Sequence, residues 1–179
     1  MTLDTNEILA NHSEFALIIQ EILENETVQK MKLYNHHYNT TCFDHCIHVA
    51  YASYWIAKKR RLDYVSAARA GMLHDLFLYD WHEKQPDTKG FHAFTHAKTA
   101  FGNANKLFHL NPIEKDAILK HMWPVTFSFP RYQESYIITL ADKYAALRES
   151  FDAYKRNSRL QKLYRYSYVF LTMVILKFI

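Results

Sequence analysis

The sequence predicts an all-α fold, a bundle of about seven or eight helices. Apolar residues recur at helical spacing almost throughout the chain, and no convincing strand alternation interrupts them. Only 3 Gly and 4 Pro occur among 179 residues, too few for a turn-rich all-β fold. No internal repeat, low-complexity tract or linker divides the chain. We therefore expect one domain over residues 1–179, long enough to bury a substantial core.

Periodicity, caps and breaks set the expected helices: 3–24, about 26 into the thirties, 42–61, 64–78, 93–109, 112–121, 132–155 and about 157–178. Thr41 ends a loop and can cap the third helix, and Asp63 can cap the fourth. The third helix ends in a basic run, which suits the negative end of a helix dipole. Pro112 stands near the first turn of the sixth helix. Residues 79–91 form the longest predicted loop, and 123–130 form a rigid connection.

The composition is that of a globular protein, with 49% hydrophobic and 22% charged residues and a formal net charge of +4. This mild positive excess could attract an anionic substrate. It is too small for a nucleic-acid groove, so no specific duplex binding is expected. Cys42 and Cys46 are expected to be reduced thiols, because a metal site built on that pair alone would lack two ligands. The first residues lack the basic segment and apolar core of a signal peptide, so we expect a cytoplasmic protein.

The last residues, 166–179, are almost wholly apolar and follow a basic stretch. The apolar run is shorter than the roughly 20 residues that a membrane span needs. We expect a final helix that packs into the core or into a homodimer interface. The alternative is an apolar tail that touches a membrane surface behind its basic residues.

His74 and Asp75 stand side by side at the end of an otherwise apolar helical run. A buried carboxylate without a partner is very costly to desolvate. A divalent metal is one such partner, since neutral imidazole and ionised carboxylate both bind it. The pair therefore predicts a metal site, provided that the rest of the chain supplies further ligands.

Four further residues fall at intervals that suit one site: His45, His96, His121 and Asp142. The successive gaps are 29, 21, 25 and 21 residues, each about one helix plus one loop. Each helix could therefore return to the same point, which is a known way to build a metal site in an all-α protein. Taken alone, each histidine could be a surface residue or a helix-end residue. Asp142 is harder to explain so, because apolar residues surround it in sequence.

These residues carry a resemblance. An early histidine, His45, stands in the stretch Asp-His-Cys-Ile-His-Val-Ala over residues 44–50. The pair His74-Asp75 follows a run of small apolar residues, and Asp142 comes late in the chain. Together these features resemble the HD superfamily of metal-dependent phosphohydrolases over residues 40–147. The resemblance implies a helical bundle in which those four side chains hold one divalent metal. Some members bind a second metal through two intervening histidines, and the residues at those positions are His96 and His121.

The two-metal type implies a specific chemistry. Two metals clamp the attacking hydroxide and the phosphoryl oxygens, with Asp75 as the bridging, catalytic carboxylate. Mixed imidazole and carboxylate ligands favour Mn, Fe, Co, Ni or Zn over Mg. The residues after the pair, 76–80, lack the Gly and Lys of the HD-GYP cyclic-dinucleotide branch. Leu78 stands where the one-metal nucleotidase branch has Glu. The resemblance thus indicates the reaction class and leaves the substrate open.

Candidate substrate contacts flank the proposed ligands. His82 or His92 could protonate a leaving oxygen, because imidazole titrates near neutral pH. Lys98, Arg131 and Lys143 could bind phosphate, with Lys143 favoured because it adjoins the last proposed ligand. Each could equally be a solvated residue.

Three functions remain open at this stage. The first is a metal-dependent phosphohydrolase acting on a small phosphorylated metabolite or nucleotide. The second is a non-catalytic metal- or nucleotide-sensing module whose C-terminal helix contacts a partner or a membrane. The third is an oxygenase of the same fold with a di-iron site, which nothing in the sequence specifically requires.

Overall fold

A computed structural model of the chain describes residues 4–37, 40–80, 92–154, 167 and 169–174. The elements follow in the order α1 (Thr5–Asn11), α2 (Ser13–Leu23), α3 (Glu26–Gln29), the 3-10 helix η1 (Lys30–Leu33), β1 (Asn35–His37), β2 (Thr40–Thr41), α4 (Cys42–Lys59), α5 (Tyr64–Leu73), α6 (His92–Leu107), α7 (Pro112–Lys120) and α8 (Gln133–Tyr154). The prediction of an all-α bundle is confirmed.

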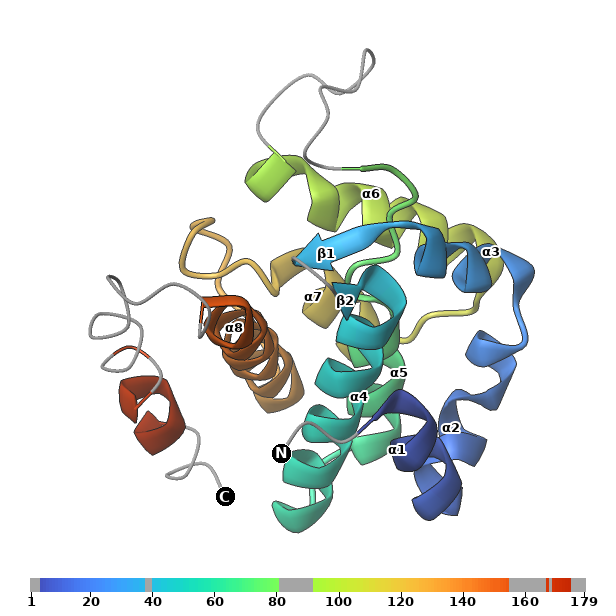
Figure 1. Cartoon of the computed structure of the whole chain (residues 1–179), viewed down its shortest axis with the longest axis horizontal. Coiled ribbons are helices and arrows are strands. Elements are labelled where there is room, and N and C mark those ends of the chain that lie inside the picture. The colour runs from blue at the N-terminus through green and yellow to red at the C-terminus, as the bar shows by residue number, and fades with distance from the viewer. Residues whose placement is uncertain (1–3, 38–39, 81–91, 155–166, 168, 175–179) are drawn as a thin grey trace.

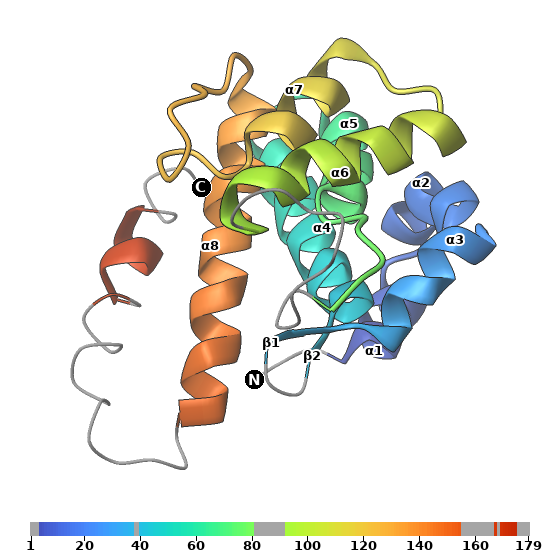
Figure 2. The ribbon, with the colours of Figure 1, turned by 90° about the horizontal axis from the view of Figure 1, so that it is seen from above.

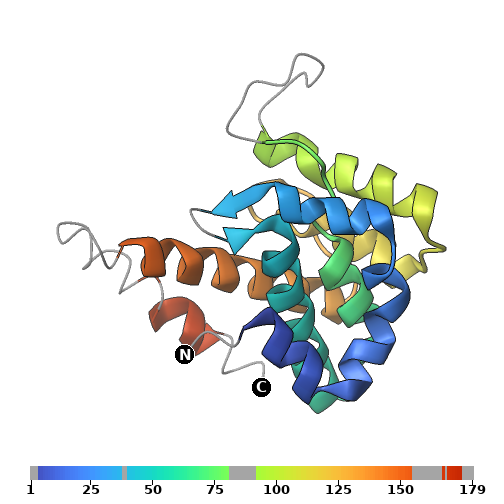
Figure 3. The same cartoon turned by 45° about the vertical axis from the view of Figure 1, so that its right-hand side comes forward.

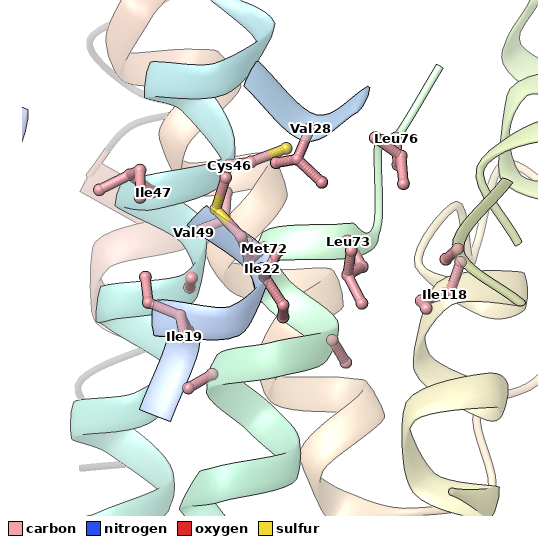
Figure 4. Close-up of a cluster of buried hydrophobic side chains, with 14 of the residues drawn as sticks. Ile19, Ile22, Val28, Cys46, Ile47, Val49, Met72, Leu73, Leu76 and Ile118 are labelled. Atoms are coloured by element: carbon pink, nitrogen blue, oxygen red, sulfur yellow. The ribbon is translucent and has the colours of Figure 1, made fainter. Parts of the chain in front are cut away.

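Helix α4 lies at the centre of the bundle and packs against both α5 and α8 (Figures 1 and 2). Helix α7 packs against α5, α6 and α8, and α2 covers α5. Buried apolar side chains from these layers form one continuous core (Figure 4), including Ile19, Ile22, Val28, Ile47, Val49, Met72, Leu73, Leu76 and Ile118. The helices that carry the predicted ligands therefore all border the same interior.

Helices α4 and α5 approach each other closely at Gly71. A Cβ atom built there would lie 2.7 Å from Cα of Ala50, a distance that real Cβ atoms essentially never reach. Glycine thus permits a backbone contact that any side chain would prevent. The contact lies two residues before the end of α5, so it fixes how closely the residues that follow approach α4.

The predicted caps are present. The Thr41 side chain accepts a hydrogen bond from the Asp44 backbone N–H at 3.1 Å, and Asp63 accepts one from Ser66 N–H at 2.9 Å. Helix α7 begins with Pro112 and a capping box between Asn111 and Glu114. These bonds satisfy N–H groups that a helix start leaves unpaired, and they set where the site-bearing helices begin.

The prediction of one helix over 3–24 was wrong, because the backbone leaves the helical region at His12. The His12 ring lies 2.8 Å from the Tyr51 hydroxyl, and Thr5 donates to Asp44 across α4. Ile8 on α1 and the apolar face of α2 are both buried in the same core on either side of this break.

The prediction of a helix over 64–78 also overran. Helix α5 ends at Leu73, and backbone bonds from Leu76 to Leu73 and from Phe77 to Asp75 form a tight turn. Leu76 and Phe77 stay fully buried in the extended segment that follows. Apolarity alone therefore misled the prediction, because a buried non-helical segment is as apolar as a helix.

The sequence showed no convincing strand, yet a short antiparallel hairpin joins β1 to β2. It lies where α4 begins, with α6 on one side and α8 on the other (Figure 3). The register shifts between Asn35 and His37, so the residue between them, His36, is bulged out of the pairing. A bulge re-aims a side chain, and this one directs His36 into the protein.

The described part of the predicted C-terminal helix, 167 and 169–174, is helical. Val169, Phe170 and Met173 are 43%, 69% and 62% exposed, so these side chains are not part of the core. Within the described ranges, no helix has the length and apolarity needed to cross a bilayer.

Candidate metal centre

The structure brings all six predicted metal ligands together, from five different elements. His45 lies in the first turn of α4. His74 caps the C-terminus of α5, and Asp75 follows it in the turn. The others lie on α6, at the C-cap of α7 and in the middle of α8: His96, His121 and Asp142. All six are buried, with exposed fractions between 0% and 7%. A cluster of this kind inside a core requires a compensating partner.

A first cluster forms around Asp142. One of its oxygens, Oδ1, lies 3.3 Å from Nε2 of His45 and 3.8 Å from Nε2 of His74. The same His74 nitrogen lies 3.6 Å from Oδ2 of Asp75. Two imidazoles and two carboxylates thus point their donor atoms at one small volume.

A second cluster forms on the other oxygen of Asp75. Oδ1 lies 3.4 Å from Nε2 of His96 and 3.4 Å from Nε2 of His121. The two histidine nitrogens are 2.8 Å apart. Asp75 therefore presents one oxygen to each cluster, as a bridging carboxylate does.

Backbone carbonyls fix the tautomers of two of these rings. Nδ1 of His74 donates to the Gly71 carbonyl at 2.8 Å, and Nδ1 of His121 donates to the Ile118 carbonyl at 2.9 Å. In a neutral imidazole the other nitrogen then carries a lone pair. Both Nε2 atoms are consequently presented to the clusters as acceptors, the form in which histidine binds a metal.

These residues fit a divalent metal. Nε2 of His74 and Oδ1 of Asp75 are buried and have no hydrogen-bond partner among the described residues, although each faces other acceptors. Donors bound to one metal at about 2.0–2.2 Å stand about 3–4 Å apart, which matches the spacings above. A cation would satisfy all of these atoms at once, and mixed N and O donors suit the later first-row metals. The metal-binding prediction is confirmed to this extent: three buried His/Asp groups have the required spacing.

Electrostatics in the first cluster are dominated by carboxylates. Burial lowers the pKa of His45, but the charges of Glu149 and Asp142 overcome it and hold that pKa well above its usual value. The pKa of His74 is likewise raised well above its usual value, against burial, chiefly by Asp75. In the second cluster burial prevails: the pKa of His121 falls to about 3. The first cluster therefore attracts positive charge much more strongly.

Sequence reasoning missed two residues of this centre, Glu149 and His36. Glu149 lies on α8, seven residues after Asp142, and its Oε1 accepts from Nδ1 of His45 at 2.9 Å. Nε2 of His36 lies 3.1 Å from Oδ2 of Asp75. A spacing of seven places two residues on one helix face, so Glu149 could have been found. No pattern in the sequence predicted the β-bulge that directs the His36 side chain into the protein.

The predicted substrate residues differ in placement. Nζ of Lys143 donates to the backbone carbonyl of His121 at 3.0 Å and to Oδ2 of Asp142 at 3.2 Å, so it borders both clusters. Arg131 and Lys98 are exposed. Lys98 is two residues from the ligand on α6 and thus faces another direction.

The two predicted general acids remain untested. His82 lies outside the described residues, as does the side chain of His92.

The two cysteines are free and buried next to the centre, as predicted for reduced thiols. Cys42 Sγ donates to the Asp75 carbonyl at 3.2 Å, and Cys46 Sγ lies 3.9 Å from Nδ1 of His74. Burial raises the pKa of Cys46 well above its usual value, so this thiol stays protonated and packs as an apolar group.

Comparison with known proteins agrees with this geometry. The family model for the HD domain matches residues 42–147, more than half of the chain. The matched segment begins at the first residue of α4 and ends within α8. No curated protein and no solved structure matches the chain significantly.

Proposed function

Because the chain belongs to the HD domain family, we propose that it is a metal-dependent phosphohydrolase acting on a small phosphorylated metabolite or nucleotide. Hydrolysis would use a metal-activated water. The observation that carries the proposal is the division of Asp75 between two buried donor clusters. Two neighbouring cations held by one carboxylate suit an in-line displacement at phosphorus, because they can stabilise both the attacking and the leaving oxygen.

The ligand sets follow from the distances. His45, His74, Asp142 and Oδ2 of Asp75 would hold the first ion. His96, His121 and Oδ1 of Asp75 would hold the second. When bound, divalent ions lower the pKa of a water molecule and neutralise charge on phosphoryl oxygens. Among the described residues the second set offers three protein donors, and catalytic sites with three protein ligands commonly keep an open position for water or substrate.

Lys143 is the side chain best placed to receive a phosphate. It comes from α8 and bridges the two clusters through its contacts with His121 and Asp142. Its side chain is 26% exposed, so it can also reach the solvent side. An ammonium group there would attract the substrate anion without becoming a ligand itself.

The test is metal analysis followed by an activity panel. The purified protein is stripped, reconstituted with Mn, Fe, Co, Ni, Zn or Mg in turn, and analysed for ions per chain. Each form is assayed for phosphate release from phosphomonoesters and nucleotides, and for hydrolysis of cyclic nucleotides and other diesters. We expect up to two ions per chain and metal-dependent hydrolysis that is lost in Asp75→Asn. Metal binding without turnover of any phosphoester would contradict the proposal.

The same panel carries its own controls. Lys143→Met should raise the KM for the active substrate with less effect on kcat, because the proposed contact is with the phosphate. Lys98→Met removes an exposed lysine two residues from His96 and is expected to leave KM unchanged.

A further inference from the structure

Next to the first cluster lies a carboxylate, Glu149, that is not one of the proposed metal ligands. The side chain of Glu149 on α8 is only 8% exposed, and its two oxygens reach two histidines. Oε1 accepts from Nδ1 of His45 at 2.9 Å, and Oε2 lies 3.5 Å from Nδ1 of His36. The rings of His36 and His45 stack, with centroids 3.7 Å apart and planes 17° from parallel. The Glu149 carboxylate thus contacts the Nδ1 atoms of both stacked rings.

The other edges of the two rings face the metal centre. Nε2 of His45 lies 3.3 Å from Oδ1 of Asp142, and Nε2 of His36 lies 3.1 Å from Oδ2 of Asp75. His45 therefore has a carboxylate at each nitrogen. When it binds a metal it keeps only one ring proton, and the two carboxylates compete for it.

The location of that proton decides whether His45 can be a ligand. With the proton on Nδ1, directed at Glu149, the lone pair of Nε2 faces the metal position. With the proton on Nε2, directed at Asp142, the ring blocks that position instead. The contact to Glu149 is 0.4 Å shorter than the contact to Asp142 (2.9 against 3.3 Å), which favours the first arrangement.

We propose that Glu149 is a positioning residue that holds the ring proton of His45 on Nδ1 and thereby sets the affinity of the first metal subsite. Carboxylates that accept the second N–H of a metal-binding histidine commonly change metal affinity 10- to 100-fold. His36 adds a second support, because it covers the face of His45 and contacts the Asp75 oxygen that belongs to the same subsite. The inference rests on the metal-binding part of the proposed function and not on phosphoester hydrolysis.

Two near-isosteric variants separate this role from general packing. Glu149→Met keeps the volume but cannot accept a hydrogen bond from His45. Glu149→Gln keeps one acceptor oxygen without the charge. Ser150→Ala is the matched control, since it removes a neighbouring polar group on the same helix. Metal dissociation constants are measured by chelator competition, and folding is checked by thermal unfolding.

We expect Glu149→Met to weaken the tighter metal about 10- to 100-fold and Glu149→Gln to weaken it less, with Ser150→Ala unchanged. In the Zn-loaded protein, proton NMR should show a downfield, exchange-protected Nδ1–H signal for His45. The signal should persist in Glu149→Gln and be lost in Glu149→Met.

Equal metal affinity in the Met variant and the wild type would overturn the inference, as would an unaltered His45 signal in both variants. If Glu149→Met does not fold, the inference is tested by the His45 signal of the wild type and by the Glu149→Gln variant. A wild-type protein that lacks the protected Nδ1 proton would also overturn the inference. A wild type that binds metal but hydrolyses nothing would refute the proposed function and leave this inference standing.

Discussion

The first and second clusters, which form the two halves of the metal centre, share Asp75 and differ in their other charged groups. The first half combines two imidazoles with Asp142, and Glu149 and His36 stand behind it. In the part of the chain that the structure describes, the second half has two imidazoles and no carboxylate besides the shared one. The pKa shifts differ accordingly: carboxylates raise the pKa of His45 and His74 against burial, whereas burial lowers that of His121 to about 3. The first half is thus a carboxylate-rich cation site, whereas in the second half burial keeps the imidazole of His121 uncharged.

This difference in ligands predicts different roles for the two metal ions. A site with four protein donors and a carboxylate behind one of them resembles closed structural metal sites. A site with three protein donors among the described residues leaves positions for water and substrate, and Lys143 borders both halves. We therefore expect the first ion to be bound more tightly and the second to exchange with solvent more readily.

The largest expected effect removes the residue that the halves share. Asp75→Asn keeps the shape but removes the negative charge and one of the two bridging oxygens, so both ions should bind weakly. Loss of several kcal/mol of electrostatic stabilisation corresponds to a fall in kcat/KM of about 10³-fold or more. Metal content by elemental analysis and the hydrolysis assay check this. A variant that retained two ions per chain would refute the bridging role.

The next effect separates the halves. His121→Ala should abolish binding of the second ion but leave the first, while His45→Ala should weaken the first ion most. Replacing one of three protein ligands costs more than replacing one of four, so His121→Ala should lose activity by about 10²-fold or more. Ion stoichiometry against free metal concentration distinguishes the two variants. His109→Ala, an exposed histidine outside the centre, serves as the control. Identical loss of both ions in both ligand variants would show that the halves are not separable.

The pH dependence should differ between the halves as well. The raised pKa values mean that His45 and His74 bind protons in the metal-free protein, so the first ion must displace protons. Its affinity should rise by up to about tenfold per pH unit for each proton displaced at any pH below the raised pKa, and should level off above it. His121, with a pKa of about 3, gives no such competition above pH 5. Calorimetric titrations in buffers of different ionisation enthalpy count the protons released; no release at the tighter site would contradict this account.

The two halves also differ in how many of their residues could be predicted from the sequence. His74 and Asp75 stood out because an apolar run makes a polar pair conspicuous, and helix-plus-loop spacing located His96 and His121. That reasoning works because each ligand lies at or near a helix end or on an inward helix face. It could not locate His36, because a bulge in a short hairpin depends on tertiary contacts and leaves no periodic signal. It also overran the end of α5, since Leu76 and Phe77 are buried without being helical.

A packing variant tests whether the first half depends on the close contact of α4 with α5. In Gly71→Ala the new Cβ would meet the Ala50 backbone, so α5 must shift away from α4 together with His74. Overpacking of this kind costs about 1–3 kcal/mol in the free energy of unfolding, and the affinity for the first ion should fall more than the affinity for the second. Gly102→Ala is the control, because nothing lies within 4 Å of its added methyl group. There the helix should gain stability by up to about 1 kcal/mol. Denaturant unfolding measures both, and equal effects would refute the claim.

The smallest effect concerns His36, which contacts the first half without belonging to its proposed ligand set. His36→Phe keeps a ring stacked on His45 but removes the contacts to Asp75 and Glu149. Since a hydrogen bond to a charged group contributes about 1.5–3 kcal/mol at most and the metal offsets part of its loss, the first ion should bind only a few-fold more weakly. Asn35→Ala, exposed on the same strand, should have no effect. A loss as large as that in His45→Ala would mean that His36 is itself a ligand, and the first half would then have five protein donors against three in the second.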